Sequence, residues 1–298
     1  MQVLRVVIVA LLLVMTASAT RGAEPALSPK VIPNVSYFEG SGADKVRHKL
    51  DIYVPAGVKN FPVVFFVHGG AWRIGDKDHY RIYSKFADSL AKSGIGMVST
   101  NYRLFPKVKH PDQIKDVAKA FAWTFRNIKK YGGDPNAIFV CGHSAGGHLV
   151  ALLATDEKYL KRHKLSHKCI CGAIPVSGVY TILNQPTFTQ VFGKSEKMRK
   201  SGSPINFVSK TVPPFLIMHA EYELPGCTPP LARAFYNALN KVGATATLYE
   251  AKRQNHVTIM LGMRNQRNTV HQKILEFIRT QTRTQAASKE VQTAEANR

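Results

Sequence analysis

The chain has 298 residues, of which 45% are hydrophobic, and its formal net charge is +22. A chain of this length and apolar content can bury a substantial core, either as one large α/β domain or as two small domains. The basic charge favours anionic partners such as acidic polysaccharide, anionic lipid or nucleic acid. Because the charge is spread along the chain and we find no nucleic-acid-binding module, a solvated basic surface is the better interpretation, and no nucleic-acid partner is expected.

The first residues have the pattern of a secretory signal peptide. Arg5 precedes an apolar run over residues 6–15, and small residues follow, with an A-x-A site ending at Ala19 and a second candidate cleavage site at Ala23. The run is too short to span a bilayer, so a cleaved leader over residues 1–23 is favoured over an uncleaved membrane anchor. We therefore expect a secreted or periplasmic protein with no membrane span after removal of the leader.

Residues 31–281 have the pattern of one domain in which strands and helices alternate. The first two expected strands alternate apolar and polar residues, as antiparallel strands do, whereas later ones are continuous apolar runs typical of strands buried on both faces. This order predicts a mostly parallel central sheet with helices on both faces. Strands are expected at 35–40, 48–56, 61–70, 94–104, 137–142, 171–180, 214–222 and 245–251, and helices at 79–94, 110–133, 144–156, 229–243 and 268–280.

Two segments depart from this alternation of strands and helices. Residues 183–210 are rich in polar and basic side chains and lie between two expected strands. We expect them to form a small cap segment over a pocket. From residue 282 onward the apolar periodicity stops, so residues 282–298 are expected to be a disordered tail.

A G-x-S-x-G pattern runs from Gly142 to Gly146, with Ser144 at its centre. It follows an expected strand and opens an expected helix, which is the context of a nucleophile elbow, a strained turn that exposes the serine at the carboxyl end of the strand. Open α/β sheets bind ligands at this edge, and the N–H groups at the start of the helix point to the same place. We therefore expect Ser144 to be a nucleophile rather than a capping residue in a glycine-rich turn.

A second glycine-rich loop, the HGGAW segment at residues 68–72, ends an earlier buried strand. Such a loop presents backbone N–H groups without side chains in the way, and together with the N–H of Ala145 they can hold a developing oxyanion. The loop donors are expected among Gly69, Gly70 and Ala71, and the pattern leaves the pair open.

A serine nucleophile needs a base and an acid, and in this architecture the chain order is serine, acid, histidine. His256 lies in an expected loop after a strand, whereas His271 lies within an expected helix, so His256 is the expected base. The acid should follow the strand at 214–222. Glu221 continues that strand and Glu223 lies in the turn after it, so we favour Glu223 and keep Glu221 as the alternative.

Two further side chains next to these groups are expected to bind substrate. His143 directly precedes the serine, and Trp72 closes the HGGAW loop. The four cysteines contain no C-x-x-C pair, so the sequence predicts no metal site, and no cofactor is expected.

Together these residues resemble the α/β-hydrolase superfamily. They are most similar to its HGGxW esterase/lipase branch, which includes hormone-sensitive-lipase-like esterases, bacterial acetyl-xylan and feruloyl esterases, kynurenine formamidase and isoprenylcysteine methylesterase. The segments that carry the resemblance are HGGAW at 68–72, the run from Asn101 to Asp156, and SGVY at 177–180. The resemblance covers most of the chain after the leader and implies an α/β-hydrolase fold.

The resemblance also implies Ser144 as nucleophile, His256 as base and an acid at Glu223, where the branch usually has aspartate. The expected function is hydrolysis of carboxylic esters through a Ser-His-Glu triad, with a small acyl group such as acetyl or feruloyl on a small molecule or a polysaccharide. An aryl formamidase or a lipase on the same scaffold is the alternative enzyme. A non-catalytic binding protein that retains the hydrolase fold is the alternative outside enzymes.

Overall fold

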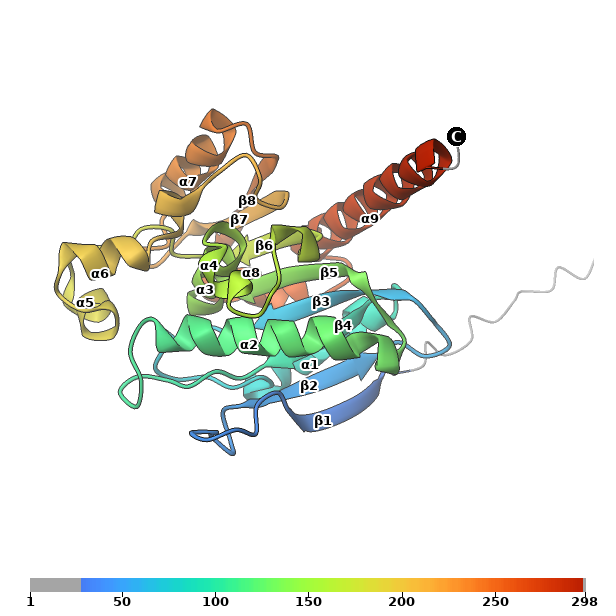
Figure 1. Cartoon of the computed structure of the whole chain (residues 1–298). Coiled ribbons are helices and arrows are strands. Elements are labelled where there is room, and N and C mark those ends of the chain that lie inside the picture. Colours follow the sequence, from blue (N-terminus) through green and yellow to red (C-terminus); the bar gives the residue numbers. More distant parts are fainter. Residues whose placement is uncertain (1–27, 297–298) are drawn as a thin grey trace, which may run out of the picture.

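The structure, a computed structural model, describes residues 28–296, and the leader expected at residues 1–23 lies outside the described residues. Its centre is one eight-stranded sheet with the order β1-β2-β4-β3-β5-β6-β7-β8 (Figure 1). The β1–β2 and β2–β4 pairs are antiparallel and the other neighbouring pairs are parallel, which confirms the expected mostly parallel sheet. The strands are β1 (Lys30–Ser36), β2 (Lys49–Val54), β3 (Phe61–Val67), β4 (Gly96–Thr100), β5 (Gly133–His143), β6 (Gly172–Val176), β7 (Phe215–Tyr222) and β8 (Ala246–Asn255).

Helices cover both faces of the sheet, and two hydrophobic clusters show which helix covers which face. Side chains of α2, α3 and α7 pack against one face, and side chains of α1, α8 and α9 pack against the other. In β3, Val63 and Phe65 belong to the first cluster while Val64 and Phe66 belong to the second, because successive side chains of a strand point to opposite faces. The helices are α1 (Ile82–Ala91), α2 (Asp112–Asn127), α3 (Ala145–Thr155), α4 (Lys158–Lys161), α5 (Pro186–Phe192), α6 (Glu196–Ser201), α7 (Pro229–Lys241), α8 (His256–Met263) and α9 (Thr269–Ala296), with short 3-10 helices at His79–Arg81, Ile128–Tyr131, His167–Cys169 and Pro204–Phe207.

The carboxyl ends of the parallel strands bring distant segments of the chain together. The HGGAW loop follows β3, Ser144 follows β5, Glu223 follows β7, and β8 leads directly into His256 at the start of α8. Since ligands of open α/β sheets bind at this edge, the topology gathers the expected site residues there.

The segment at 183–210 forms α5, α6 and the last 3-10 helix, which lie together beside the sheet (Figure 1). Its aromatic side chains pack on the HGGAW loop: Phe188 and Phe192 of α5 have ring centroids 6.0 and 4.9 Å from that of Trp72. The Arg73 guanidinium donates a hydrogen bond of 2.7 Å to the Gln190 side-chain oxygen. The expected cap segment therefore covers the indole of this loop.

The C-terminal region differs from the disordered tail expected at residues 282–298. Helix α9 continues to Ala296 and extends away from the sheet beyond its buried part (Figure 1). Val270, Ile274 and Ile278 anchor its first turns in the core. The later residues contain no glycine or proline and are rich in alanine, glutamine and glutamate, so helix propensity continues the helix after the apolar periodicity has ended. Within the described part of the chain, no helix has the length and apolar content needed to cross a membrane.

Candidate active site

Ser144 occupies a strained turn between β5 and α3. Its backbone has φ 56° and ψ −119°, a conformation that residues other than glycine rarely adopt. The flanking glycines make the turn possible: a Cβ at Gly142 would lie 2.5 Å from the backbone of Gly146, and one at Gly146 would lie 2.0 Å from the carbonyl oxygen of Val67. The G-x-S-x-G spacing is thus a steric requirement, and it leaves the serine hydroxyl partly exposed at the carboxyl edge of the sheet.

His256 is the first residue of α8, whereas the sequence placed it in a loop. β8 runs four residues further than expected, to Asn255, and the helix begins at once. The Asn255 side chain accepts hydrogen bonds from the N–H groups of Val257 and Thr258, and Thr258 completes a capping box. This cap fixes the backbone on which the imidazole is held, with its Nε2 atom 2.9 Å from Ser144 Oγ.

Glu223 completes a continuous chain of hydrogen bonds from the serine. Its Oε2 atom lies 2.5 Å from His256 Nδ1, and its Oε1 atom accepts hydrogen bonds from the Ser177 hydroxyl at 2.5 Å and from the Ala220 N–H at 2.8 Å. Burial favours the neutral acid, but the hydrogen bonds from His256, Ser177 and Ala220 outweigh burial and lower the pKa of Glu223. The carboxylate is therefore charged near neutral pH. It holds the proton of the neutral imidazole on Nδ1, which leaves Nε2 free to accept the serine proton.

The alternative acid lies elsewhere. Glu221, in the last part of β7, accepts a hydrogen bond from the Arg253 N–H at 2.7 Å, and this bond lowers its pKa. Its carboxylate is partly exposed, and the hydrogen bond and ion pair to the imidazole come from Glu223 instead. The structure thus brings Glu223, and not Glu221, to His256.

His143 packs against His256, the candidate base. Its ring is buried, and burial together with the neighbouring His256 lowers its pKa to about 3, so it is neutral at ordinary pH. Its Nε2 atom lies 2.8 Å from the His256 carbonyl oxygen, which can only accept, so Nε2 carries the proton. The two imidazole rings are 4.7 Å apart at an angle of 49°. His143 therefore borders the cavity described below and also braces the start of α8.

The glycine loop lies directly against the serine. A Cβ at Gly69 would lie 2.9 Å from the His143 carbonyl oxygen and 3.3 Å from Ser144 Cβ, so only glycine fits there. Gly70 has φ 109°, and a Cβ on it would lie 2.2 Å from the backbone oxygen of Ile74. Ala145, whose N–H begins α3, is buried immediately after the serine. The backbone N–H groups of this loop and of the helix start are thus close to Ser144, as expected for an oxyanion site.

Trp72 does not reach the cavity, in contrast to the expectation that it binds substrate. Positive φ angles at Ala71 and Trp72, of 51° and 61°, turn the side chain into the core, where it is 2% exposed. Its indole N–H donates to His148 Nδ1 at 3.2 Å, and His148 Nε2 donates to the Gly202 carbonyl oxygen at 2.7 Å. Trp72 therefore links the glycine loop to α3 and to the cap segment.

A cavity of about 310 Å³ opens beside the serine hydroxyl. Ser144, His143 and His256 form one side of it, together with Gly69, Gly70 and Gly75. The rest of its wall is mainly apolar and is formed by Ala71, Ile74, Tyr83, Leu224 and Met260, with His79 at the rim. Ile74 and Leu224 are 64% and 54% exposed, so the mouth of the cavity is apolar as well.

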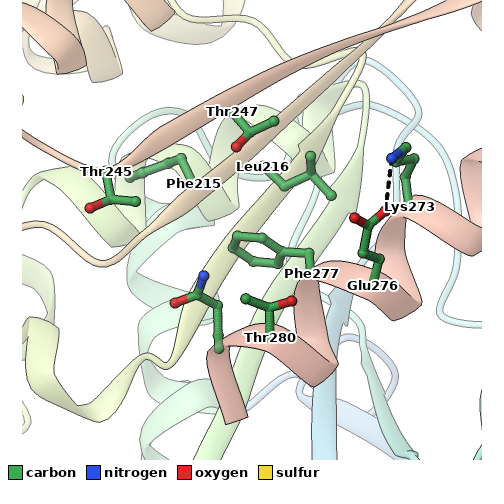
Figure 2. Close-up of a pocket in the computed structure, with 9 residues that line it drawn as sticks. Phe215, Leu216, Thr245, Thr247, Lys273, Glu276, Phe277 and Thr280 are labelled. Atoms are coloured by element: carbon green, nitrogen blue, oxygen red, sulfur yellow. Dashed lines mark hydrogen bonds and ion pairs between the residues drawn. The ribbon is translucent and has the colours of Figure 1, made fainter. Parts of the chain in front are cut away.

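A different cleft, of about 190 Å³, lies between β7, β8 and α9 (Figure 2). Phe215 and Thr245 border it at the beginnings of these strands, and Phe277 fills its floor. Lys273 and Glu276, both on α9, form an ion pair of 2.7 Å at one side of it. Ser144 follows the carboxyl end of β5, whereas this cleft borders the amino ends of β7 and β8. The cleft is therefore separate from the candidate active site.

Ser177 was missed from the sequence although it belongs to the site. It follows β6, the strand next to β5, and has φ 50°, which turns its hydroxyl toward Glu223 Oε1. Its position in the sequence could have indicated it, because Ser177 precedes a glycine at the carboxyl end of β6, the parallel strand that follows β5 in the chain. No group of three or more potential metal ligands occurs within residues 28–296, and the cysteines in that range form no disulfide bond.

The sequence matches the BD-FAE family model over residues 50–224. It is 32% identical to esterase LipQ of Mycobacterium tuberculosis over 73% of this chain and 55% of that protein. It is 30% identical to isoprenylcysteine alpha-carbonyl methylesterase of Arabidopsis thaliana over 73% of this chain and 56% of that protein. The chain thus spans about half the length of these curated relatives.

Solved structures of esterases share the fold. A truncated carbohydrate esterase from gut microbiota has a TM-score of 0.74 at 22% identity, covering 87% of this chain and 98% of that chain. Esterase B from Lactobacillus rhamnosis has a TM-score of 0.75 at 20% identity, covering 88% of this chain and 90% of that chain. The family match, the relatives and the shared architecture confirm the resemblance seen in the sequence. The chain therefore belongs to the BD-FAE family, in the esterase branch of the α/β-hydrolases.

Proposed function

We propose that the protein hydrolyses carboxylic esters with Ser144 as nucleophile, His256 as base and Glu223 as acid. The observation that carries this proposal is the hydrogen-bond chain from Ser144 Oγ to His256 and on to Glu223, with distances of 2.9 and 2.5 Å, at the side of an open cavity. The esterase names of the matched relatives support it.

The reaction follows from the position of each proton. His256 Nε2 takes the proton of Ser144 Oγ as this oxygen attacks the ester carbonyl carbon, and the imidazolium then gives that proton to the leaving alkoxide. Water, deprotonated by the same nitrogen, attacks the acyl-enzyme carbonyl; the bond to Ser144 Oγ breaks, the imidazolium returns its proton to this oxygen, and the carboxylic acid is released. The charged Glu223 carboxylate stabilises the imidazolium in both steps, and its bonds to Ser177 and to the Ala220 N–H keep it aligned.

The negative charge of the tetrahedral intermediate needs donors that are already in place. The N–H of Ala145 and the loop N–H groups of Gly69 and Gly70 are the proposed oxyanion donors, since these residues flank Ser144 and the loop carries no side chain that could block them. The Gly69 N–H now lies 3.4 Å from the Tyr83 hydroxyl, a weak bond that a bound oxyanion can replace.

The cavity favours a small acyl group. At about 310 Å³ with walls from Ala71, Ile74, Tyr83, Leu224 and Met260, it matches a short acyl or a single aromatic acyl group better than a long chain. We propose acetyl or feruloyl esters, on a small molecule or a polysaccharide. The leader pattern at residues 1–23 supports an exported enzyme that meets such substrates outside the cytoplasm.

The test is hydrolysis of p-nitrophenyl acetate by the parent, by Ser144→Ala and by Ser195→Ala, a control that removes the exposed serine capping the start of α6. Ser144→Ala should lose about 10⁴-fold or more in kcat, and the control should retain the parent rate. Equal rates in the parent and Ser144→Ala would overturn the proposal. A series of p-nitrophenyl esters of increasing length, with acetylated xylan, a feruloyl ester and an aryl formamide, then separates an esterase from a lipase or a formamidase.

A further inference from the structure

A basic cleft lies outside the candidate active site. It has a volume of about 540 Å³ and is lined by Lys85 and Ser89 of α1, by Lys92 directly after this helix, and by residues 264–267, which follow α8. Lys85 and Lys92 are seven residues apart, about two helical turns, and the loop after α8 contributes Arg264 and Arg267 to the same cleft. We call this the α1–α8 cleft; it is lined by these four cations and by the neutral side chains between them.

Cations predominate in the α1–α8 cleft. Among the described residues, no acidic side chain lines it. Within residues 28–296, none of these lysines and arginines lies within ion-pair distance of a carboxylate, although other lysines on the surface form such pairs with nearby acids. Like charges gathered around one hollow repel one another, so this arrangement is stabilised by an anion placed among them.

The neutral lining residues indicate which kind of anion fits. Ser89, Asn265 and Gln266 supply a hydroxyl and two amides, and none of the described residues brings an aromatic or aliphatic side chain to the border of the cleft. A single-stranded nucleic acid is held by stacking on aromatic side chains as well as by charge, and a membrane surface is held by inserted apolar side chains. The lining of this cleft offers neither kind of side chain. Sugars that carry carboxylate or sulfate groups offer charges for the cations and hydroxyls for the amides.

The cleft lies next to the candidate active site on the same pair of helices. The Tyr83 hydroxyl of α1 contacts Met260 of α8 where both line the cavity beside Ser144. Further along, the Ser89 hydroxyl donates to the Arg264 carbonyl oxygen at 2.5 Å where both line the cleft. Six residues of α1 separate the two contacts, which corresponds to about 9 Å of helix. A few units of one glycan chain can span that distance.

We propose that the α1–α8 cleft binds the anionic sugar units of an acylated polysaccharide whose ester group lies at Ser144. The position of the ester group at Ser144 rests on the proposed esterase function. Binding of the glycan in the cleft does not depend on that function. The substrate class is thereby narrowed from polysaccharide esters in general to esters of anionic polysaccharides.

The test compares two variants with equal changes of net charge. The cleft variant carries Lys85→Gln, Lys92→Gln, Arg264→Gln and Arg267→Gln, and the control variant replaces four exposed lysines on other elements by glutamine, at positions 129, 130, 197 and 210. Both are made in the Ser144→Ala background, and calorimetry measures their binding to polygalacturonate and to neutral dextran at low ionic strength. The same cleft and control substitutions are also made in protein that retains Ser144, and the hydrolysis of p-nitrophenyl acetate and of acetylated polygalacturonate is measured.

The cleft variant should bind polygalacturonate about tenfold or more weakly than the parent, because charge-assisted hydrogen bonds are lost, while the control stays within about twofold. Its KM for acetylated polygalacturonate should rise by a similar factor, with the kcat and the rate on p-nitrophenyl acetate unchanged. Equal weakening in both variants would overturn the proposal, since binding would then follow net charge alone. Tighter cleft-dependent binding of single-stranded DNA or of phosphatidylserine vesicles would also overturn it. Cleft-dependent glycan binding without any ester hydrolysis would support the binding site and overturn the esterase function.

Discussion

Acidification from pH 7 to pH 5 is expected to destabilise this protein steeply, because four of its histidines are buried in neutral form. His68, His110, His143 and His148 are at most 6% exposed. Burial is the main cause that lowers the pKa of His68 and of His148 to about 4, and that of His110 and of His143 to about 3, from an ordinary value of 6.5. Hydrogen bonds from His68, His143 and His148 to backbone carbonyl oxygens favour the charged form, but burial outweighs them.

The sign and size of the effect follow from proton linkage. In the unfolded chain these imidazoles take up protons as the pH falls through about 6.5, whereas in the folded chain they remain neutral until about pH 4. The histidine contribution is therefore complete above about pH 7 and is lost progressively as the pH falls toward the folded pKa values. Between pH 7 and pH 5 each histidine costs about 2 kcal/mol, or about 8 kcal/mol together. That loss is comparable with the whole free energy of unfolding of an ordinary domain, about 5–15 kcal/mol.

Urea unfolding followed by circular dichroism at pH 7, 6 and 5 measures this loss. The measurements should be made at low salt and again at about 0.5 M NaCl, where the Debye length is only a few ångströms and surface charge repulsion is screened. The steep fall should persist at high salt, because it arises from burial of the rings. An unfolding free energy that stays level from pH 7 to pH 5, or a fall that disappears in salt, would refute the reasoning.

Three further predictions concern single side chains. Gly146→Ala places a Cβ 2.0 Å from a β3 carbonyl oxygen, and urea unfolding should show a loss of at least about 1–3 kcal/mol; unchanged stability would contradict the steric account of the elbow. Asp116→Ala leaves the partly exposed Arg103 without the carboxylate that holds it at 2.8 Å, and thermal unfolding should show a loss of about 1–3 kcal/mol, whereas unchanged stability would mean that water replaces the carboxylate. Glu223→Gln should lower kcat on p-nitrophenyl acetate by about 10²–10⁴-fold with Glu221→Gln near the parent rate, and the opposite order would reverse the assignment of the acid.

The fold could be predicted because hydrophobic periodicity and turn residues mark most strands of the sheet and the helices α1, α2, α3 and α7 and the first part of α9. The continuous apolar run of β3 is explained by burial on both faces, and the glycines around Ser144 by a turn that no Cβ fits. The order serine, acid, histidine limited the candidates, and the positions of Glu223 and His256 after strands favoured them over Glu221 and His271. The structure places His256 beside Ser144 and Glu223 against His256, although both are far from the serine in the sequence.

What could not be predicted depends on contacts between distant segments. Trp72 turns into the core because of positive φ angles and a partner on α3, neither of which leaves a pattern in the sequence. Ser177 contacts Glu223 only because β6 and β7 are neighbours in the sheet. His256 starts a helix because Asn255 caps it, a signal that was present but lay inside a short segment without clear periodicity.

Labelling with a fluorophosphonate probe tests the central claim most directly, because the probe forms a covalent bond only with an activated serine hydroxyl. Mass spectrometry of the folded protein should place the label on the peptide that contains Ser144, and labelling should be lost in His256→Ala and after denaturation. Labelling of a different serine, or equal labelling of the parent and His256→Ala, would contradict the account.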